Sequence, residues 1–152
     1  MLVRTAFLSA ILLLASGADT IDESYQQAGQ WTITVTPLKL PAAAQGVKGY
    51  SKQICRAPLG RDGFPKVGSE RQLAPGVTCR VTEISPFDGP YRRVDLCRRA
   101  DQTAATQITY VGQHSPERYT LEITTEMAGR PDVTVVVRED GERTGPCPGS
   151  KP

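Results

Sequence analysis

Four cysteines constrain the fold of this chain more than any other feature of its sequence: Cys55, Cys79, Cys97 and Cys147. An even number of cysteines in a chain of 152 residues is typical of two disulfides formed in an oxidising compartment. No two of them are spaced as Cys-x-x-Cys, which disfavours a redox-active pair. The chain has a single histidine and no closely spaced cysteines, so we expect no metal site and no cofactor.

The cysteine spacing alone allows three disulfide pairings, and a predicted hairpin chooses among them. Residues 77–85 and 91–98 have the composition of two strands, and residues 86–90 between them contain the turn signal Asp-Gly. If the first strand ends opposite the start of the second, Cys79 falls directly opposite Cys97. The hairpin therefore predicts a disulfide between these two residues.

The same register places Val81 opposite Asp95 and Glu83 opposite Arg93, and the latter pair has opposite charges. The remaining cysteines then form the disulfide Cys55–Cys147. In the chain-entropy model the short loop stabilises the fold by roughly 3 kcal/mol and the long loop by roughly 4 to 5 kcal/mol. The second disulfide would join the C-terminal tail to the early part of the domain.

The first eighteen residues have the pattern of a secretory signal peptide. Arg4 precedes an apolar run from Ala6 to Ala15, and small residues follow it at positions 16–18. This run is about half of the roughly 20 apolar residues that cross a bilayer, which favours cleavage over a membrane anchor. We expect residues 1–18 to be removed, and the exported, soluble protein to begin near Asp19.

Residues 19–152 have the length of a single domain, with an ordered core expected at about 29–148. The chain has 18 Lys plus Arg against 16 Asp plus Glu, so no strong overall charge attracts nucleic acid. We expect a periplasmic protein with no transmembrane anchor after cleavage of the signal.

Alternating apolar and polar residues predict a mostly β fold. Pro37 and Pro41 end the first strand, and residues 56–76 form a long Gly- and Pro-rich loop that is functional or partly mobile. About seven strands joined in sequence order predict a single antiparallel meander, bent into a half-open barrel or folded into a small sandwich. The predicted strands are residues 31–36, 50–55, 77–85, 91–98, 103–111, 118–127 and 131–138.

Several short motifs resemble a known family, and they stand in this order: Gly29-Gln30-Trp31, Cys55-Arg56-Ala57-Pro58, Cys79-Arg80-Val81-Thr82, Cys97, Tyr119 and Gly145-Pro146-Cys147-Pro148. Together they are similar to the bacterial envelope family called domain of unknown function 3617. The resemblance spans nearly the whole exported part and implies a periplasmic protein of Gram-negative bacteria, without implying any chemistry. The family usually has a helix-starting segment after Cys-x-x-Pro. Residues 59–63 take its place in this chain, so the resemblance does not decide whether a short helix forms there.

A basic cluster on the strand at 91–98 is the first candidate site, with Arg80 expected nearby across the hairpin. Arg92 and Arg98 share one face of this strand, whereas Arg93 and Arg99 share the other with Cys97. Because arginine binds phosphate and carboxylate in a bidentate way, Arg92 and Arg98 are candidate contacts for an anionic partner. The favoured alternative is a solvated face on which the arginines pair with Glu83, Asp95 and Asp101.

His114 is the second candidate, within the predicted turn at residues 112–116. A nucleophile needs a base within hydrogen-bond reach, and neighbours in an exposed turn, such as Ser115, do not point at the histidine in that way. We therefore expect an exposed turn residue and no catalytic residues in this chain.

These observations predict a non-enzymatic accessory or binding protein of the cell envelope, with an envelope protein or an anionic lipid as its partner. The alternative is a carrier of an apolar ligand, such as a lipid fragment, inside a curved sheet. Aromatic residues on strands more often belong to the core and its rim than to a ligand cavity. Those that could line such a cavity are Tyr25, Trp31, Tyr50, Tyr110 and Tyr119.

Overall fold

The computed structural model describes residues 26–85, 89–101 and 103–149, and the predicted signal peptide lies outside these residues. Eight strands form one antiparallel sheet in the order β2-β1-β8-β7-β6-β5-β4-β3. The strands are β1 (Gly29–Lys39), β2 (Tyr50–Arg56), β3 (Glu70–Ala74), β4 (Val77–Ile84), β5 (Tyr91–Arg99), β6 (Thr106–His114), β7 (Arg118–Met127) and β8 (Arg130–Gly145). Two short 3-10 helices, η1 (Ala42–Ala44) and η2 (Arg61–Gly63), lie in the connections.

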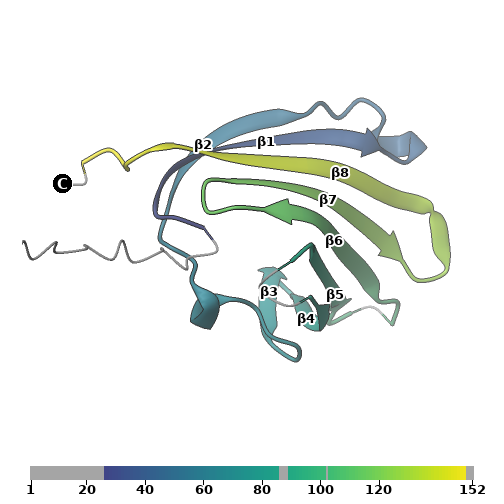
Figure 1. Ribbon diagram of the computed structural model, residues 1–152. Coiled ribbons are helices and arrows are strands. Elements are labelled where there is room, and N and C mark those ends of the chain that lie inside the picture. Colours follow the sequence, from purple (N-terminus) through teal and green to yellow (C-terminus); the bar gives the residue numbers. More distant parts are fainter. Residues whose placement is uncertain (1–25, 86–88, 102, 150–152) are drawn as a thin grey trace, which may run out of the picture.

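The sheet is open and strongly curved (Figure 1), so β1 and β2 lie over β3, β4 and β5, with β8, β7 and β6 between them. The predicted antiparallel, mostly β fold is confirmed. Of its two forms, the single curled sheet corresponds to the half-open barrel, because no second sheet forms among the described residues. β2 and β3 are the two edges, so the connection between them passes from one edge of the sheet to the other.

One face of the sheet, here called the inner face, contains the core. Trp31 and Ile33 of β1 are 0% and 2% exposed, and Tyr119 of β7 is 4% exposed. Their neighbours in sequence, such as Thr34 and Thr120, lie on the opposite, outer face and are exposed. The period-two alternation of the sequence thus buries one face and solvates the other, as predicted.

Both predicted disulfides are present. Cys79 of β4 bonds Cys97 of β5 across the inner face, and Cys55 of β2 bonds Cys147, which follows β8. The Cys79–Cys97 bridge lies in the core beside Ile108. The other bridge spans 92 residues and holds the C-terminal segment against an edge strand.

The predicted register of the β4–β5 hairpin is right at its open end and wrong near its turn. Cys79 pairs with Cys97 and Val81 with Asp95, but a bulge then places Glu83 opposite Val94 instead of Arg93. The extra residue turns Glu83 to the outer face, where it bonds Arg92. The turn at residues 86–88 lies outside the described residues.

Three predicted boundaries are also wrong. β1 continues through Pro37 to Lys39, because β2 pairs with β1 only as far as Val35 and the proline nitrogen therefore interrupts no bond to β2. The predicted loop at 56–76 contains the edge strand β3 and the helix η2. β8 extends to Gly145, and the strand count rises from about seven to eight. β1 lies between β2 and β8, so the neighbours in the sheet do not follow sequence order throughout.

Candidate functional site

Arg92 and Arg98 both lie on the outer face of β5 and are exposed, as the alternation of the strand predicts. They are six residues apart, which corresponds to about 20 Å along a strand. Arg92 donates from Nε to Glu83 Oε1 at 2.6 Å, so its charge is already paired. The two arginines therefore have different surroundings, and their joint contact with an anion stays a prediction.

Arg98 instead shares a groove with Arg80 on the outer face of β3, β4 and β5. This cavity, called the β3–β5 groove from here on, measures about 530 Å³. Such a volume lies within the range of roughly 300 to 1,000 Å³ that is usual for sites that bind small ligands. Its lining includes Val67, Glu70, Thr78, Arg80, Thr82, Leu96 and Arg98.

The local strand pairing explains why these side chains converge. Thr78 pairs with Arg98 and Arg80 pairs with Leu96. Two neighbouring outward positions of β4 therefore lie beside two of β5. On the other side of β4, Arg80 pairs with Glu70 of the edge strand β3. Cationic, hydroxyl and apolar side chains are thereby placed on one surface by three neighbouring strands.

The groove carries a net positive charge, because two arginines and a single carboxylate, Glu70, line it. Among the residues that the structure describes, neither Arg80 nor Arg98 forms an ion pair, although Glu70 lines the same cavity. The other arginines of the cluster have the predicted partners, since Arg93 pairs with Asp95 and Arg99 with Asp101. The ion pairs that the solvated-face interpretation expects are therefore present for Arg92, Arg93 and Arg99, and none forms at Arg80 or Arg98 among the described residues.

A second polar cluster lies on the inner face and centres on Asp95, which is 0% exposed. Arg93 donates from Nε and Nη2 to its two carboxylate oxygens at 2.6 and 2.7 Å. Arg71 of β3 donates to Asp95 Oδ2 at 3.1 Å and to the Tyr110 hydroxyl at 2.7 Å. The guanidinium carbon of Arg93 also lies 5.3 Å from the Tyr110 ring centroid. This cluster joins the edge strand β3 to the centre of the sheet.

A third cluster closes the other end of the inner face. The Tyr119 hydroxyl donates to Glu139 Oε1 at 2.7 Å and accepts from Arg56 Nη2 at 3.2 Å. Arg56 also lies over the rings of Trp31 and Tyr119, at 5.7 and 5.4 Å from their centroids. Burial raises the pKa of Tyr119, and its hydrogen bond to Glu139 raises it further. Glu139 in this cluster and Asp95 in the second cluster are therefore both hydrogen-bonded to other residues of the protein.

The remaining candidates are placed as follows. His114 is the last residue of β6, paired across the sheet with Tyr119, and it is half-buried instead of lying exposed in a turn. Tyr50 is 55% exposed on the edge strand β2, so it does not line the core, and Tyr25 lies outside the described residues. Among the described residues, no three His, Cys, Asp or Glu side chains converge in a way that could hold a metal ion.

Sequence reasoning found Arg80 and Arg98 but not the groove between them. Val67 and Glu70 belong to a segment that shows no apolar alternation, so nothing in the sequence placed them beside β4. Within the described part of the chain, no helix is long and apolar enough to cross a membrane. Comparison of the chain with known protein families, with curated proteins and with solved structures found no match.

Proposed function

We propose that this chain is a non-enzymatic binding protein of the bacterial cell envelope that holds an anionic group in the β3–β5 groove. The observation that carries the proposal is the pair Arg80 and Arg98, two arginines without a carboxylate partner in one cavity. Guanidinium groups bind phosphate and carboxylate through paired, charge-assisted hydrogen bonds. Thr78 and Thr82 add hydroxyl groups, and Leu96 and Val67 add apolar surface for an adjoining acyl or sugar moiety.

The proposed location is the periplasm. Two disulfides fit a chain that folds in an oxidising compartment. The apolar leader at residues 6–15 has the pattern of a secretory signal, and the motifs at Trp31 and the four cysteines resemble an envelope family. A phosphorylated glycolipid of the envelope is then an anionic partner that the groove could meet.

The absence of catalysis is part of the proposal and rests on how the acidic groups are used. Asp95 is fully buried between two arginines, so it does not contact solvent or a substrate. Glu139 accepts a hydrogen bond from the Tyr119 hydroxyl within the third cluster. Neither of these two carboxylates lines the β3–β5 groove, and the one that does, Glu70, has no histidine, cysteine or serine beside it in the lining.

A carrier of an apolar ligand is the second candidate, and the curvature of the sheet favours it. Val35, Leu121, Ile123 and Val137 are half-buried on the inner face, where a lipid fragment could lie. The charged Asp95 cluster and the stacked Arg56 occupy parts of the same face, which supports the outer groove as the better site. Native mass spectrometry of the periplasmic protein would detect a retained apolar ligand directly.

Binding to purified lipopolysaccharide tests the groove. We expect the affinity to fall as salt rises, because exposed charges are screened over about 8 Å at physiological ionic strength. The double variant Arg80→Gln/Arg98→Gln should bind about tenfold more weakly or worse, since it removes charge-assisted hydrogen bonds worth about 1.5 to 3 kcal/mol each. Its melting temperature should stay nearly unchanged, because both side chains lie on the surface.

Arg92→Gln is the matched control, because Arg92 lies on the same strand and face but is paired with Glu83. We expect this variant to bind lipopolysaccharide like the wild type. If the double variant binds normally, the groove is not the site. If Arg92→Gln is as weak as the double variant, the pair Arg92 and Arg98 carries binding instead.

A further inference from the structure

The end of β1, the start of β2 and the connection between them, residues 38–50, form an apolar tip at one end of the sheet. Three of its large side chains are exposed: Leu38 at 53%, Val47 at 59% and Tyr50 at 55%. Leu38 and Val47 also border a surface hollow of about 510 Å³ that includes Leu40. This segment is called the β1–β2 tip below. Leu38, Leu40 and Val47 share this hollow, and Tyr50 begins β2 on the far side of the connection, so the apolar residues of the tip are not scattered singly.

The charged side chains of the β1–β2 tip and of the two strands that it joins, β1 and β2, are all positive. No Asp or Glu occurs between Glu23 and Asp62, whereas Lys39, Lys48 and Lys52 lie in or next to the tip. None of these three lysines forms an ion pair with any described residue. They are three of the five lysines in the chain. The apolar tip is therefore flanked by three ammonium groups that form no ion pair with a described residue.

The acidic residues on the neighbouring strand do not neutralise these lysines. β8 pairs with β1 through Val136 opposite Lys39, and its nearby carboxylates have other partners. Asp132 pairs with Arg130, and Asp140 pairs with Arg138. Lys52 Nζ lies over the Tyr50 ring, 5.9 Å from its centroid, so the ammonium group and the ring make a cation–π contact.

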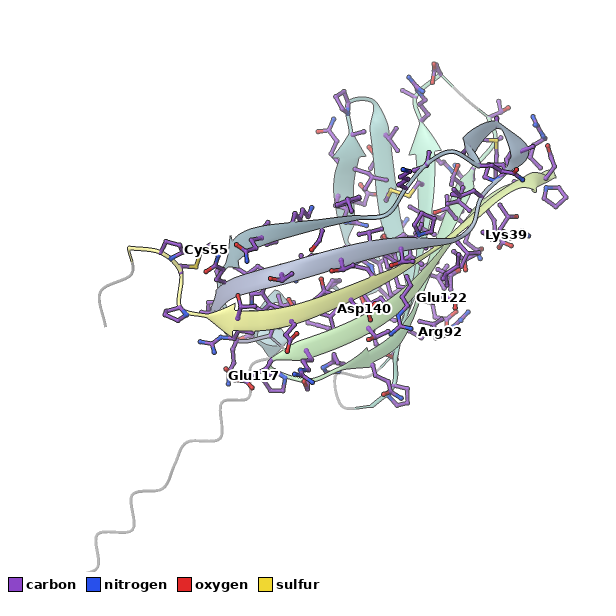
Figure 2. All side chains as sticks on the ribbon, turned by 90° about the horizontal axis from the view of Figure 1, so that it is seen from above. Lys39, Cys55, Arg92, Glu117, Glu122 and Asp140 are labelled. Carbon is purple, nitrogen blue, oxygen red and sulfur yellow. A yellow bond between two sulfur atoms is a disulfide. The ribbon has the colours of Figure 1, made fainter. Side chains whose placement is uncertain are left out.

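This combination fits the interface of an anionic bilayer better than it fits bulk water. Exposed apolar side chains can enter the headgroup region, tyrosine lies favourably at the boundary between apolar and polar layers, and lysines reach lipid phosphates with their flexible stems. Figure 2 places Lys39 at the end of β1 and β2 that lies away from Cys55, so the disulfide does not obstruct this end.

We propose that the β1–β2 tip docks on the surface of a bilayer that contains anionic phospholipid. Leu38, Val47 and Tyr50 enter the headgroup region, while the three lysines contact phosphate groups. The inference goes beyond the proposed function, because the tip lies at the β2 edge of the sheet and the β3–β5 groove at the β3 edge.

Flotation of the disulfide-bonded protein with lipid vesicles tests the proposal. We expect binding to vesicles of phosphatidylcholine mixed with phosphatidylglycerol, and little binding to phosphatidylcholine alone. Leu38→Ser/Val47→Ser and Lys39→Gln/Lys48→Gln should each weaken vesicle binding by about tenfold or more, given the usual contributions of buried apolar side chains and of lysines near an anionic surface. The lysine variant should also lose most of the salt dependence.

Two control variants separate this proposal from others. Val111→Ser removes an exposed apolar side chain from the middle of the sheet and should leave vesicle binding unchanged. Arg118→Gln removes an exposed cation that pairs with Glu142 and should do the same, because the lysines of the tip, and not surface cations in general, carry the proposed binding. Hydrogen exchange of the wild type provides a readout that needs no variant: vesicles should slow exchange at residues 38–50. Absence of binding to the anionic vesicles, or tip variants that bind like the wild type, would overturn the proposal.

Discussion

Asp95 is the residue on which the interior of the sheet depends most. Its carboxylate is completely buried and meets three arginine nitrogen atoms within 3.1 Å. Arg93 is itself only 9% exposed, so its charge would be stranded without this partner. A buried ion pair is costly to break from one side, although its replacement by two apolar residues is often tolerated.

We therefore predict that Asp95→Ala lowers the free energy of unfolding by about 3 to 5 kcal/mol in urea denaturation. Arg93→Met/Asp95→Leu should be more stable than Asp95→Ala alone, because it removes both buried charges. Asp132→Ala is the matched control, since its pair with Arg130 lies on the surface, and it should unfold like the wild type. An Asp95→Ala protein of normal stability would show that the buried pair does not support the fold.

Three tyrosines of the inner face make stability depend on alkaline pH. Burial raises the pKa of Tyr91, Tyr110 and Tyr119 above the ordinary value of 10.0. Above pH 10 the folded protein thus holds phenolic protons that the unfolded chain releases. The free energy of unfolding should be constant with respect to these groups below pH 10 and should fall as the pH rises further.

Absorbance of phenolate in the ultraviolet, followed together with circular dichroism, checks this dependence. We expect the three buried phenols to ionise only above pH 10, and in step with loss of structure. Tyr119→Phe should make the alkaline loss of stability less steep, because one of the groups with a raised pKa is gone. Ionisation of every tyrosine near pH 10 in a fully folded protein would disprove the prediction.

At the scale of single elements, β7 and β8 fit together because a glycine faces an aromatic ring. Tyr119 pairs with Gly141, and a Cβ atom at position 141 would collide with the ring of Tyr119. We predict that Gly141→Ala lowers stability by about 1 to 3 kcal/mol through displacement of that ring. Gly46→Ala is the control, since nothing lies within 4 Å of the added atom. Equal melting temperatures for the two variants would contradict this account of the packing.

The strands that the sequence predicts well are those with apolar alternation. β4 was recognisable because Val77, Cys79 and Val81 alternate with polar residues, and β5 because it follows the turn signal of the same hairpin and brings Cys97 opposite Cys79. β3 was missed because all five of its residues are exposed at an edge and no apolar alternation marks them. The last part of β8, residues 139–145, was missed for a related reason. Its charged side chains give no strand signal, and hydrogen bonds to β1 and β7 hold it in the sheet.

The candidate site was only partly predictable for the same physical reason. The alternation of β4 and β5 places Arg80 and Arg98 on the outer face, and this much follows from the sequence. The bulge after Val81 turns Glu83 to the outer face, where it forms an ion pair with Arg92. This bulge depends on local backbone geometry that the residue types do not predict. The wall formed by Val67 and Glu70 depends on β3, so the groove itself became visible only in the folded chain.

At the scale of the whole molecule, the two disulfides differ in exposure. Cys79 and Cys97 are 1% and 3% exposed in the core, whereas Cys55 lies exposed on the edge strand β2. The pairing of both disulfides was predictable. The hairpin places Cys79 opposite Cys97, and the two remaining cysteines, Cys55 and Cys147, must then pair with each other. Pairing of β1 with β8 was not predictable, since it joins residues 97 to 115 positions apart and no local pattern encodes it.

We predict that mild reduction of the folded protein opens Cys55–Cys147 before Cys79–Cys97, because a reductant must reach the sulfur atoms. Alkylation followed by peptide mapping should label Cys55 and Cys147 first. The singly reduced protein should be less stable by roughly 4 to 5 kcal/mol in the chain-entropy model, because the open loop is long. Labelling of Cys79 and Cys97 first would show that the core near Ile108 is more accessible than the structure indicates.

The β3–β5 groove on the outer face is where we propose that an anionic group binds. The most direct test is a titration of the ¹⁵N-labelled protein with a phosphorylated lipopolysaccharide fragment, followed by amide chemical shifts. We predict that the largest shifts cluster at Gly68, Glu70, Arg80 and Arg98, and that they disappear in Arg80→Gln/Arg98→Gln. Shifts centred on the inner face, at Leu121 and Ile123, or no shifts at all, would contradict the claim.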